Sequence, residues 1–203
     1  MTSQYNELSG QSVERLQALA DGVFAVAMTL LVLDVRLPDA EASDNGALWD
    51  QLQGLGPQFA AYLLSFTMLG TFWLAQHTFL ERCRRSDRML AWATLAFLLF
   101  VSTLPFSAST LAEHTHLTLA VLLYWGNLLG LGLTLGWQIF HADRNALVHD
   151  PADLALVRRR LFLAQSLYAA AAAVSFVSPP ASIIGLALTQ LFFIVSPRLP
   201  VRV

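Results

Sequence analysis

The segment that most constrains this chain is RLQALADGVFAVAMTLLVLD, residues 15–34. It is apolar enough for a transmembrane helix, yet Arg15 and Asp34 bound it and Asp21 lies inside it. Its longest uncharged stretch, residues 22–33, covers only about 18 Å as an α-helix, whereas the hydrocarbon core of a bilayer is about 30 Å thick. A spanning helix must therefore place Asp21 at a depth where lipid would be expected.

The composition indicates an integral membrane protein. Only 13% of the 203 residues are charged and the mean hydropathy is +0.55, whereas soluble domains carry about 25% charge. The polar start of the chain has neither the basic region nor the short apolar core of a signal peptide, so we expect the first apolar segment to remain in the mature protein. The single cysteine, Cys83, excludes an internal disulfide framework and a cysteine-based metal cluster.

Six apolar segments follow one another and predict an all-α membrane protein with six transmembrane helices. Each is close to the length of about 20 residues that a spanning helix needs. We expect residues 1–203 to form a single six-span domain. The expected spans are residues 15–36, 57–79, 89–111, 117–140, 157–178 and 180–196.

The arginines support six crossings. The 81–88 loop and the 141–160 connection hold four each, and Arg15, Arg198 and Arg202 lie near the termini. With six crossings these eleven arginines fall on one side of the membrane and only Arg36 falls on the other. The positive-inside rule then places both termini and both arginine-rich loops in the cytoplasm.

The arginine runs RCRR and RRR have two other interpretations, as nucleic-acid or anionic-lipid patches. Because the formal net charge is −2 and membrane topology accounts for both runs, we expect the lipid bilayer and no nucleic acid as a partner. HEXXH, GXSXG, P-loop and GXGXXG patterns are absent from the sequence. We therefore expect no enzyme, no cofactor and no resident metal.

The first apolar segment has the features of a helix at the centre of an assembly. A charged side chain in lipid costs roughly 3 kcal/mol on insertion scales, so the face that carries Asp21 should meet protein or water. Val26, Leu30 and Leu33 share one stripe at i, i+4 and i+7, and Thr29 borders it. The alternative is a tilted helix with Asp21 near the cytoplasmic interface and a snorkelling arginine.

The second span supplies polar groups at the same depth. Trp73 and His77 are spaced i, i+4 and so lie on one helix face, near the cytoplasmic end with Arg15 and Asp21. These four side chains can satisfy one another's hydrogen bonds in a buried network. His77 can also be a boundary residue that faces lipid headgroups.

These residues of the first two spans, together with a pattern in the third, resemble the transmembrane protein 175 family of bacterial and endolysosomal potassium channels. The family's first helix reads Arg, three residues, Phe-Ser-Asp, then an apolar run with Thr eight residues after the Asp; Arg15, Asp21 and Thr29 match this pattern in identity and spacing. F72-W73 with His77 resembles the second-helix FWxxHH pattern, and F97-L-L-F-V101 with P105-F106 resembles the third. Leu19-Ala20 replaces Phe-Ser, Gln76 replaces the first His, and Thr94 stands where the third helix has Asn. The second half resembles the family only in its number of spans.

The resemblance implies a homotetramer in a bacterial plasma membrane, with the first helix of each subunit lining a central pore. It implies rings of Val26, Leu30 and Leu33 as the constriction, in place of a TVGYG filter, with Thr29 as a hydroxyl ring and potassium as the permeant ion. It also implies that Arg15, Asp21, Trp73 and His77, with Thr94 in the Asn position, brace the pore helix from outside the conduction path. Two other functions stay open: a secondary or proton-coupled transporter that uses Asp21 and His77, and a membrane structural or sensory protein without permeation.

Overall fold

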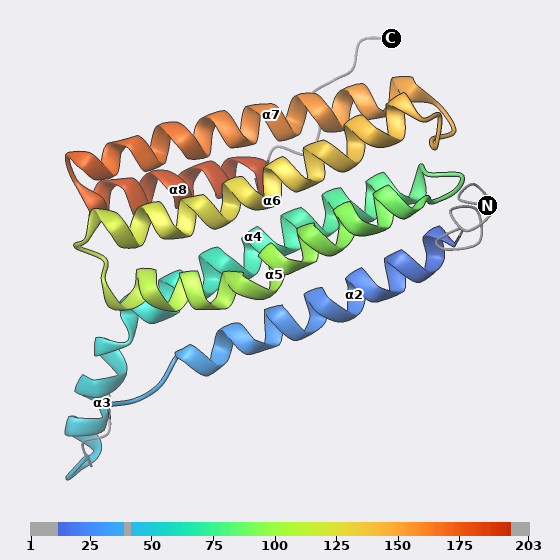
Figure 1. Ribbon diagram of the computed structural model, residues 1–203. Helices are drawn as coiled ribbons and strands as arrows, with labels where there is room; N and C mark the ends of the chain where they lie inside the picture. The colour runs from blue at the N-terminus through green and yellow to red at the C-terminus, as the bar shows by residue number, and fades with distance from the viewer. Residues whose placement is uncertain (1–11, 39–41, 196–203) are drawn as a thin grey trace.

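The computed structural model describes residues 12–38 and 42–195, which are almost entirely helical. The helices run nearly parallel in one bundle, from which the short helix α3 projects (Figure 1). Their bounds are α2 Val13–Leu30, the 3₁₀ segment η1 Leu31–Asp34, α3 Asn45–Gly54, α4 Gly56–Glu81, α5 Arg88–Glu113, α6 Thr118–Arg144, α7 Pro151–Ala173, the 3₁₀ segment η2 Val174–Phe176, and α8 Pro179–Val195.

Within the described residues, four helical segments are long and apolar enough to cross a membrane: Val13–Asp34, α4, α5 and α6. They coincide with the first four expected spans. The remaining two expected spans correspond to α7 and α8. The first half of α7 carries Arg158, Arg159 and Arg160, and α8 has 17 residues, which is about 26 Å of α-helix.

The first span differs from the continuous helix expected over 15–36. Its α-helix ends at Leu30, and η1 continues it to Asp34 with a tighter winding. The Val35 N–H then bonds to the carbonyl of Val32 at 3.1 Å. Such a 3₁₀ turn is common at a helix C-terminus because it satisfies some of the last free carbonyls. Pro38 follows four residues later, where an α-helix could not have continued undisturbed.

Aromatic packing fixes α2 against α4 and α5. Ser12 caps the start of α2 by accepting a hydrogen bond from the Arg15 N–H at 3.3 Å. Phe24 is 1% exposed, and its ring lies 5.9 Å from that of Phe97 on α5, which in turn lies 6.3 Å from Phe72 on α4. Figure 1 shows α2 at one side of the bundle, with α7 and α8 on the opposite side. One face of α2 is therefore buried and the other is left uncovered in the single subunit.

The two arginine-rich loops meet at one end of the bundle. The Arg84 N–H donates to the Leu147 carbonyl at 2.7 Å, and the His149 N–H donates to the Arg82 carbonyl at 3.0 Å. The beginning of α2 lies at the same end (Figure 1). Arg198 and Arg202, which belong to the same expected side, lie outside the described residues.

Candidate functional site: the uncovered face of α2

The apolar stripe predicted on the first helix lies on its uncovered face. Val26 is 58% exposed, Leu30 44% and Leu33 54%, whereas Phe24 on the opposite side is 1% exposed. Asp21 is also exposed, eight residues from the start of α2. The large aliphatic side chains thus share the uncovered face of an apolar spanning helix, whereas Asp21, about 180° around the helix from Leu30, is exposed on another side and reaches α4.

Thr29 lies beside the aliphatic stripe with its hydroxyl turned onto its own helix. The Oγ1 atom lies 3.0 Å from the Ala25 carbonyl and 2.8 Å from the Val26 carbonyl, so its proton is used within α2. The hydroxyl oxygen keeps its lone pairs available. Thr29 therefore presents an oxygen acceptor on the exposed side of α2, and such a group can contact a cation.

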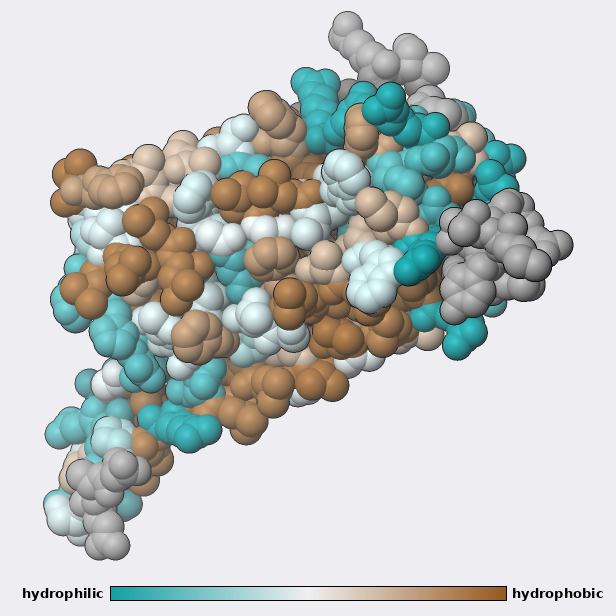
Figure 2. Space-filling view, in the orientation of Figure 1, coloured by the Kyte–Doolittle hydropathy of each residue, from teal (hydrophilic) through white to brown (hydrophobic). Residues whose placement is uncertain are grey.

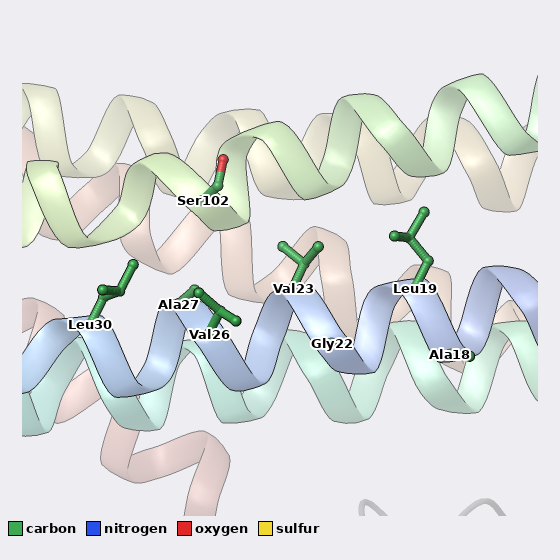
Figure 3. A pocket seen from close by; sticks show the side chains of 8 residues that line it. All are labelled: Ala18, Leu19, Gly22, Val23, Val26, Ala27, Leu30 and Ser102. Atoms are coloured by element: carbon green, nitrogen blue, oxygen red, sulfur yellow. The ribbon is translucent and has the colours of Figure 1, made fainter.

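An open groove of about 540 Å³ follows the uncovered side of α2. Figure 3 shows α2 contributing nearly all of its lining, with Ser102 across from it on α5. Ala18 and Gly22 leave little side-chain bulk in one half of it, and such small residues let another helix approach closely in a membrane. The full lining is Ala18, Leu19, Gly22, Val23, Val26, Ala27, Leu30 and Ser102.

A hydrogen bond from the second helix reaches the Asp21 carboxylate. The Trp73 Nε1–H donates to Asp21 Oδ1 at 2.7 Å. His77 stacks on the Trp73 ring at 5.4 Å between centroids, and its Nε2 lies 3.2 Å from Glu81 Oε1. Asp21, Trp73 and His77 thus form one contiguous group, and Glu81 extends it although sequence reasoning did not include it.

Arg15 is not joined to this group by its side chain. Among the described residues its guanidinium makes no hydrogen bond or ion pair with Asp21. The two residues are six positions apart, which is 600° of helical rotation and leaves them about 120° apart around the helix. Their depth is similar but their faces differ, which explains the separation.

Thr94 lies in a separate, fully buried polar cluster. Its hydroxyl has two acceptors in reach, the Leu90 carbonyl at 2.9 Å and Gln138 Oε1 at 3.0 Å, and the Gln76 Nε2–H donates to the same Gln138 oxygen at 2.9 Å. All three side chains are at most 1% exposed. This Gln76–Thr94–Gln138 cluster joins α4, α5 and α6. The sequence predicted Thr94 in one network with Asp21, Trp73 and His77, whereas its described side-chain partner is Gln138. Gln76 was noted only as a departure from the family pattern, and Gln138 was not included because its distant position in the sequence gave no local signal.

The chain is similar to known potassium channels over most of its length. The sequence model of the family described as endosomal/lysosomal potassium channel TMEM175 matches residues 15–105. A protein named as a potassium channel from Streptomyces collinus is 32% identical over 88% of this chain and 90% of its own length. Another potassium channel, from Chamaesiphon minutus, is 29% identical over 81% and 84%.

Two further matches extend the comparison. The mouse protein named endosomal/lysosomal proton channel TMEM175 is 34% identical, but over 52% of this chain and 23% of its own length. A crystal structure of a lysosomal potassium-selective channel TMEM175 homologue from Chamaesiphon minutus superposes with a TM-score of 0.81 at 26% identity, covering 91% of this chain and 97% of that one. From the extent of the Streptomyces match and this shared fold, we conclude that the chain is an integral membrane protein that belongs to the TMEM175 family of ion channels.

Proposed function

We propose that this chain forms a homotetrameric cation channel of a bacterial plasma membrane, weakly to moderately selective for potassium, with α2 of each subunit lining a central pore. The observation that carries the proposal is the exposure of Asp21 on α2, a helix at the edge of the single subunit. A carboxylate in contact with lipid at this depth would be costly. Surrounding α2 with copies of the chain and a water-filled path removes that cost.

The proposed topology is a single six-span domain over residues 1–203, with both termini in the cytoplasm. The pairing of Arg84 with the Leu147 carbonyl supports it, because the two arginine-rich loops then share one side of the membrane. The described bounds of α7 and α8 fit two further crossings, in which the arginines of α7 lie at the cytoplasmic surface. A lipid bilayer and three further copies of the chain are the only partners that this proposal requires.

The proposed constriction consists of Val26, Leu30 and Leu33, repeated around the axis by symmetry. Rings of aliphatic side chains close a narrow pore by excluding water. When the ring widens, potassium sheds its hydration more readily than sodium, which gives a modest preference. Thr29 adds a ring of hydroxyl oxygens beside the apolar rings, since its proton is already donated within α2.

The bracing group in this proposal is Asp21 with Trp73 and His77, reinforced by the buried cluster at Thr94. Its contacts favour a fixed support over the proton relay of the transporter alternative. The indole of Trp73 lies between the two titratable groups, bonded to Asp21 and stacked on His77. An indole N–H is a donor only, so it does not pass a proton from one group to the other.

The test is ion flux into liposomes that contain the purified protein, with potassium, sodium and protons measured in parallel. Protons are included because the mouse relative is named a proton channel. The proposal predicts potassium flux above sodium flux. Leu30→Asn should raise the flux or lower the potassium preference, because a polar ring stays wet.

The matched control is Leu63→Asn, at a leucine of α4 that is 54% exposed but lies outside the α2 groove. It should leave selectivity at the wild-type value. Equal effects of the two substitutions would contradict the assignment of the constriction to α2. Saturable, strictly pH-coupled flux would favour a transporter, and the absence of flux from wild type and Leu30→Asn would favour a structural protein.

A further inference from the structure

A second surface groove lies at the arginine-rich end of the bundle. It has a volume of about 370 Å³ and is lined by Asp87, Arg88, Met89 and Trp92 at the start of α5. Arg88 and Trp92 are spaced i, i+4 and so lie on one helix face. Trp92 is 60% exposed. This is a large aromatic side chain beside a cation, and neither is covered by the subunit.

The depth of this groove is fixed by the helix that carries it. The apolar segment of α5 begins at Arg88, so the groove lies where a spanning helix enters the membrane. Tryptophan is enriched at this level because its ring is apolar while its N–H seeks a polar partner. Met89 adds an apolar wall that an acyl chain can contact. The groove therefore faces headgroups at one end and hydrocarbon at the other.

The charges around the groove favour an anion. Among the described residues the Arg88 guanidinium has no hydrogen bond or ion pair, so its donors remain available. Arg84 and Arg85 precede it in the same loop. Figure 2 shows hydrophilic side chains gathered at the end of the molecule where this loop lies.

The acidic residue of the groove is engaged by the fold itself. Asp87 Oδ1 accepts the Leu90 N–H at 2.7 Å as the cap of α5, and Oδ2 lies 2.8 Å from Nε2 of His141 on α6. Both carboxylate oxygens thus have partners. Asp87 therefore opposes an incoming anion less than a free carboxylate would.

We propose that the groove of Arg88, Met89 and Trp92 binds an anionic phospholipid from the leaflet on the arginine-rich side of the membrane. Arg88 donates to the headgroup phosphate through its guanidinium. The Trp92 indole N–H donates to the glycerol or ester oxygens, and Met89 contacts the upper part of an acyl chain. One lipid is expected per subunit. This site is independent of ion conduction, so it can be present or absent whatever the permeant ion is.

The test is native mass spectrometry of the full-length protein in detergent, titrated with dioleoyl-phosphatidylglycerol and, separately, dioleoyl-phosphatidylcholine. Wild type should retain one phosphatidylglycerol per subunit in preference to phosphatidylcholine. Arg88→Gln should weaken this binding about fivefold, which is the contribution of one arginine near an anionic surface. Trp92→Leu should weaken it as well, and Arg88→Lys should retain most of it.

Arg85→Gln is the matched control because it removes the same charge from the same loop without touching the groove. It should leave the tightly bound lipid in place. An equal loss in Arg85→Gln and Arg88→Gln would mean diffuse electrostatic attraction and would overturn the site. Retention of phosphatidylglycerol by both Arg88→Gln and Trp92→Leu would overturn it too. A fall in oligomer mass in Trp92→Leu with unchanged lipid binding would assign the groove to a second copy of the chain instead.

Discussion

The indole Nε1 of Trp73 donates a 2.7 Å hydrogen bond to Oδ1 of Asp21, joining α4 to α2 across 52 positions of the sequence. This contact gives a hydrogen-bond donor to the Asp21 carboxylate, which lies eight residues into an apolar span. Among the described residues, the hydrogen bond to this carboxylate comes from another helix and not from α2. Trp73 provides that donor from the neighbouring helix.

Trp73→Phe should therefore lower the stability of the folded protein by about 1–3 kcal/mol, the cost of removing one partner of a hydrogen bond to a charged group. Asp21→Asn should cost less, since its amide oxygen still accepts the indole proton. The measurement is thermal unfolding in detergent. Trp49→Phe serves as the control, because Trp49 is 61% exposed on α3. Equal melting temperatures for Trp73→Phe and Trp49→Phe would count against the contact.

Substitutions in the Gln76–Thr94–Gln138 cluster should change the stability of the protein non-additively. Gln138→Leu removes the oxygen that accepts from the buried Gln76 amide, while the Thr94 hydroxyl keeps the Leu90 carbonyl as an acceptor. We expect a loss of about 1–3 kcal/mol for the single change, since an unsatisfied buried polar group keeps its desolvation cost. The triple variant Gln76→Leu, Thr94→Val, Gln138→Leu should recover much of it, because no unpaired partner then remains.

Chemical or thermal unfolding of the two variants beside wild type measures this difference. The single Gln76→Leu variant is a useful companion, because Thr94 then keeps its bond to Gln138 and the loss should be smaller. A triple variant less stable than Gln138→Leu would show that the cluster contributes more than the sum of its hydrogen bonds.

The close packing of α5 against Gly130 of α6 gives a stability prediction that does not involve polar groups. A Cβ atom at this position of α6 would meet the ring of Phe100 on α5, whereas a Cβ at Gly126 on the same helix would meet no atom within 4 Å. Gly130→Ala should destabilise the protein by about 1–3 kcal/mol through overpacking. Gly126→Ala should be neutral or slightly stabilising, because alanine is the better helix former. Thermal unfolding that gives both variants the same sign and size would contradict this assignment.

Local patterns in the sequence predicted much of the site. The i, i+4, i+7 spacing of Val26, Leu30 and Leu33 placed them on one stripe, and the structure leaves that stripe uncovered. The i, i+4 spacing of Trp73 and His77 predicted their shared face, which the ring stacking confirms. These features follow from helical geometry alone, so a sequence is enough to find them.

Other contacts depended on tertiary packing and escaped prediction. Gln138 on α6 contacts Gln76 on α4 and Thr94 on α5, and no helical periodicity links residues so far apart in the sequence. Arg15 shares the depth of Asp21 but not its face, a distinction that the depth argument ignored. The change from α-helix to 3₁₀-helix at Leu31 was also not anticipated, because winding at a helix end depends on its local hydrogen bonds.

The accessibility of introduced cysteines can test whether α2 lines the pore, because the chain has only one native thiol. Cys83 is 6% exposed, and burial raises the pKa of its thiol to about 12, so it should react slowly near neutral pH. Replacing it by alanine gives a background in which a single introduced cysteine can be studied. Leu30→Cys and Leu33→Cys test the uncovered face of α2, and Leu188→Cys tests a leucine of α8 that is 60% exposed.

The most direct measurement is therefore potassium flux through these three variants before and after treatment with a membrane-impermeant cationic methanethiosulfonate. If α2 lines the pore, the reagent should block most of the flux in Leu30→Cys and Leu33→Cys and leave Leu188→Cys unchanged. If the reagent left the flux unchanged in both Leu30→Cys and Leu33→Cys, while the Cys83→Ala background conducted normally, the claim that α2 lines the pore would be contradicted.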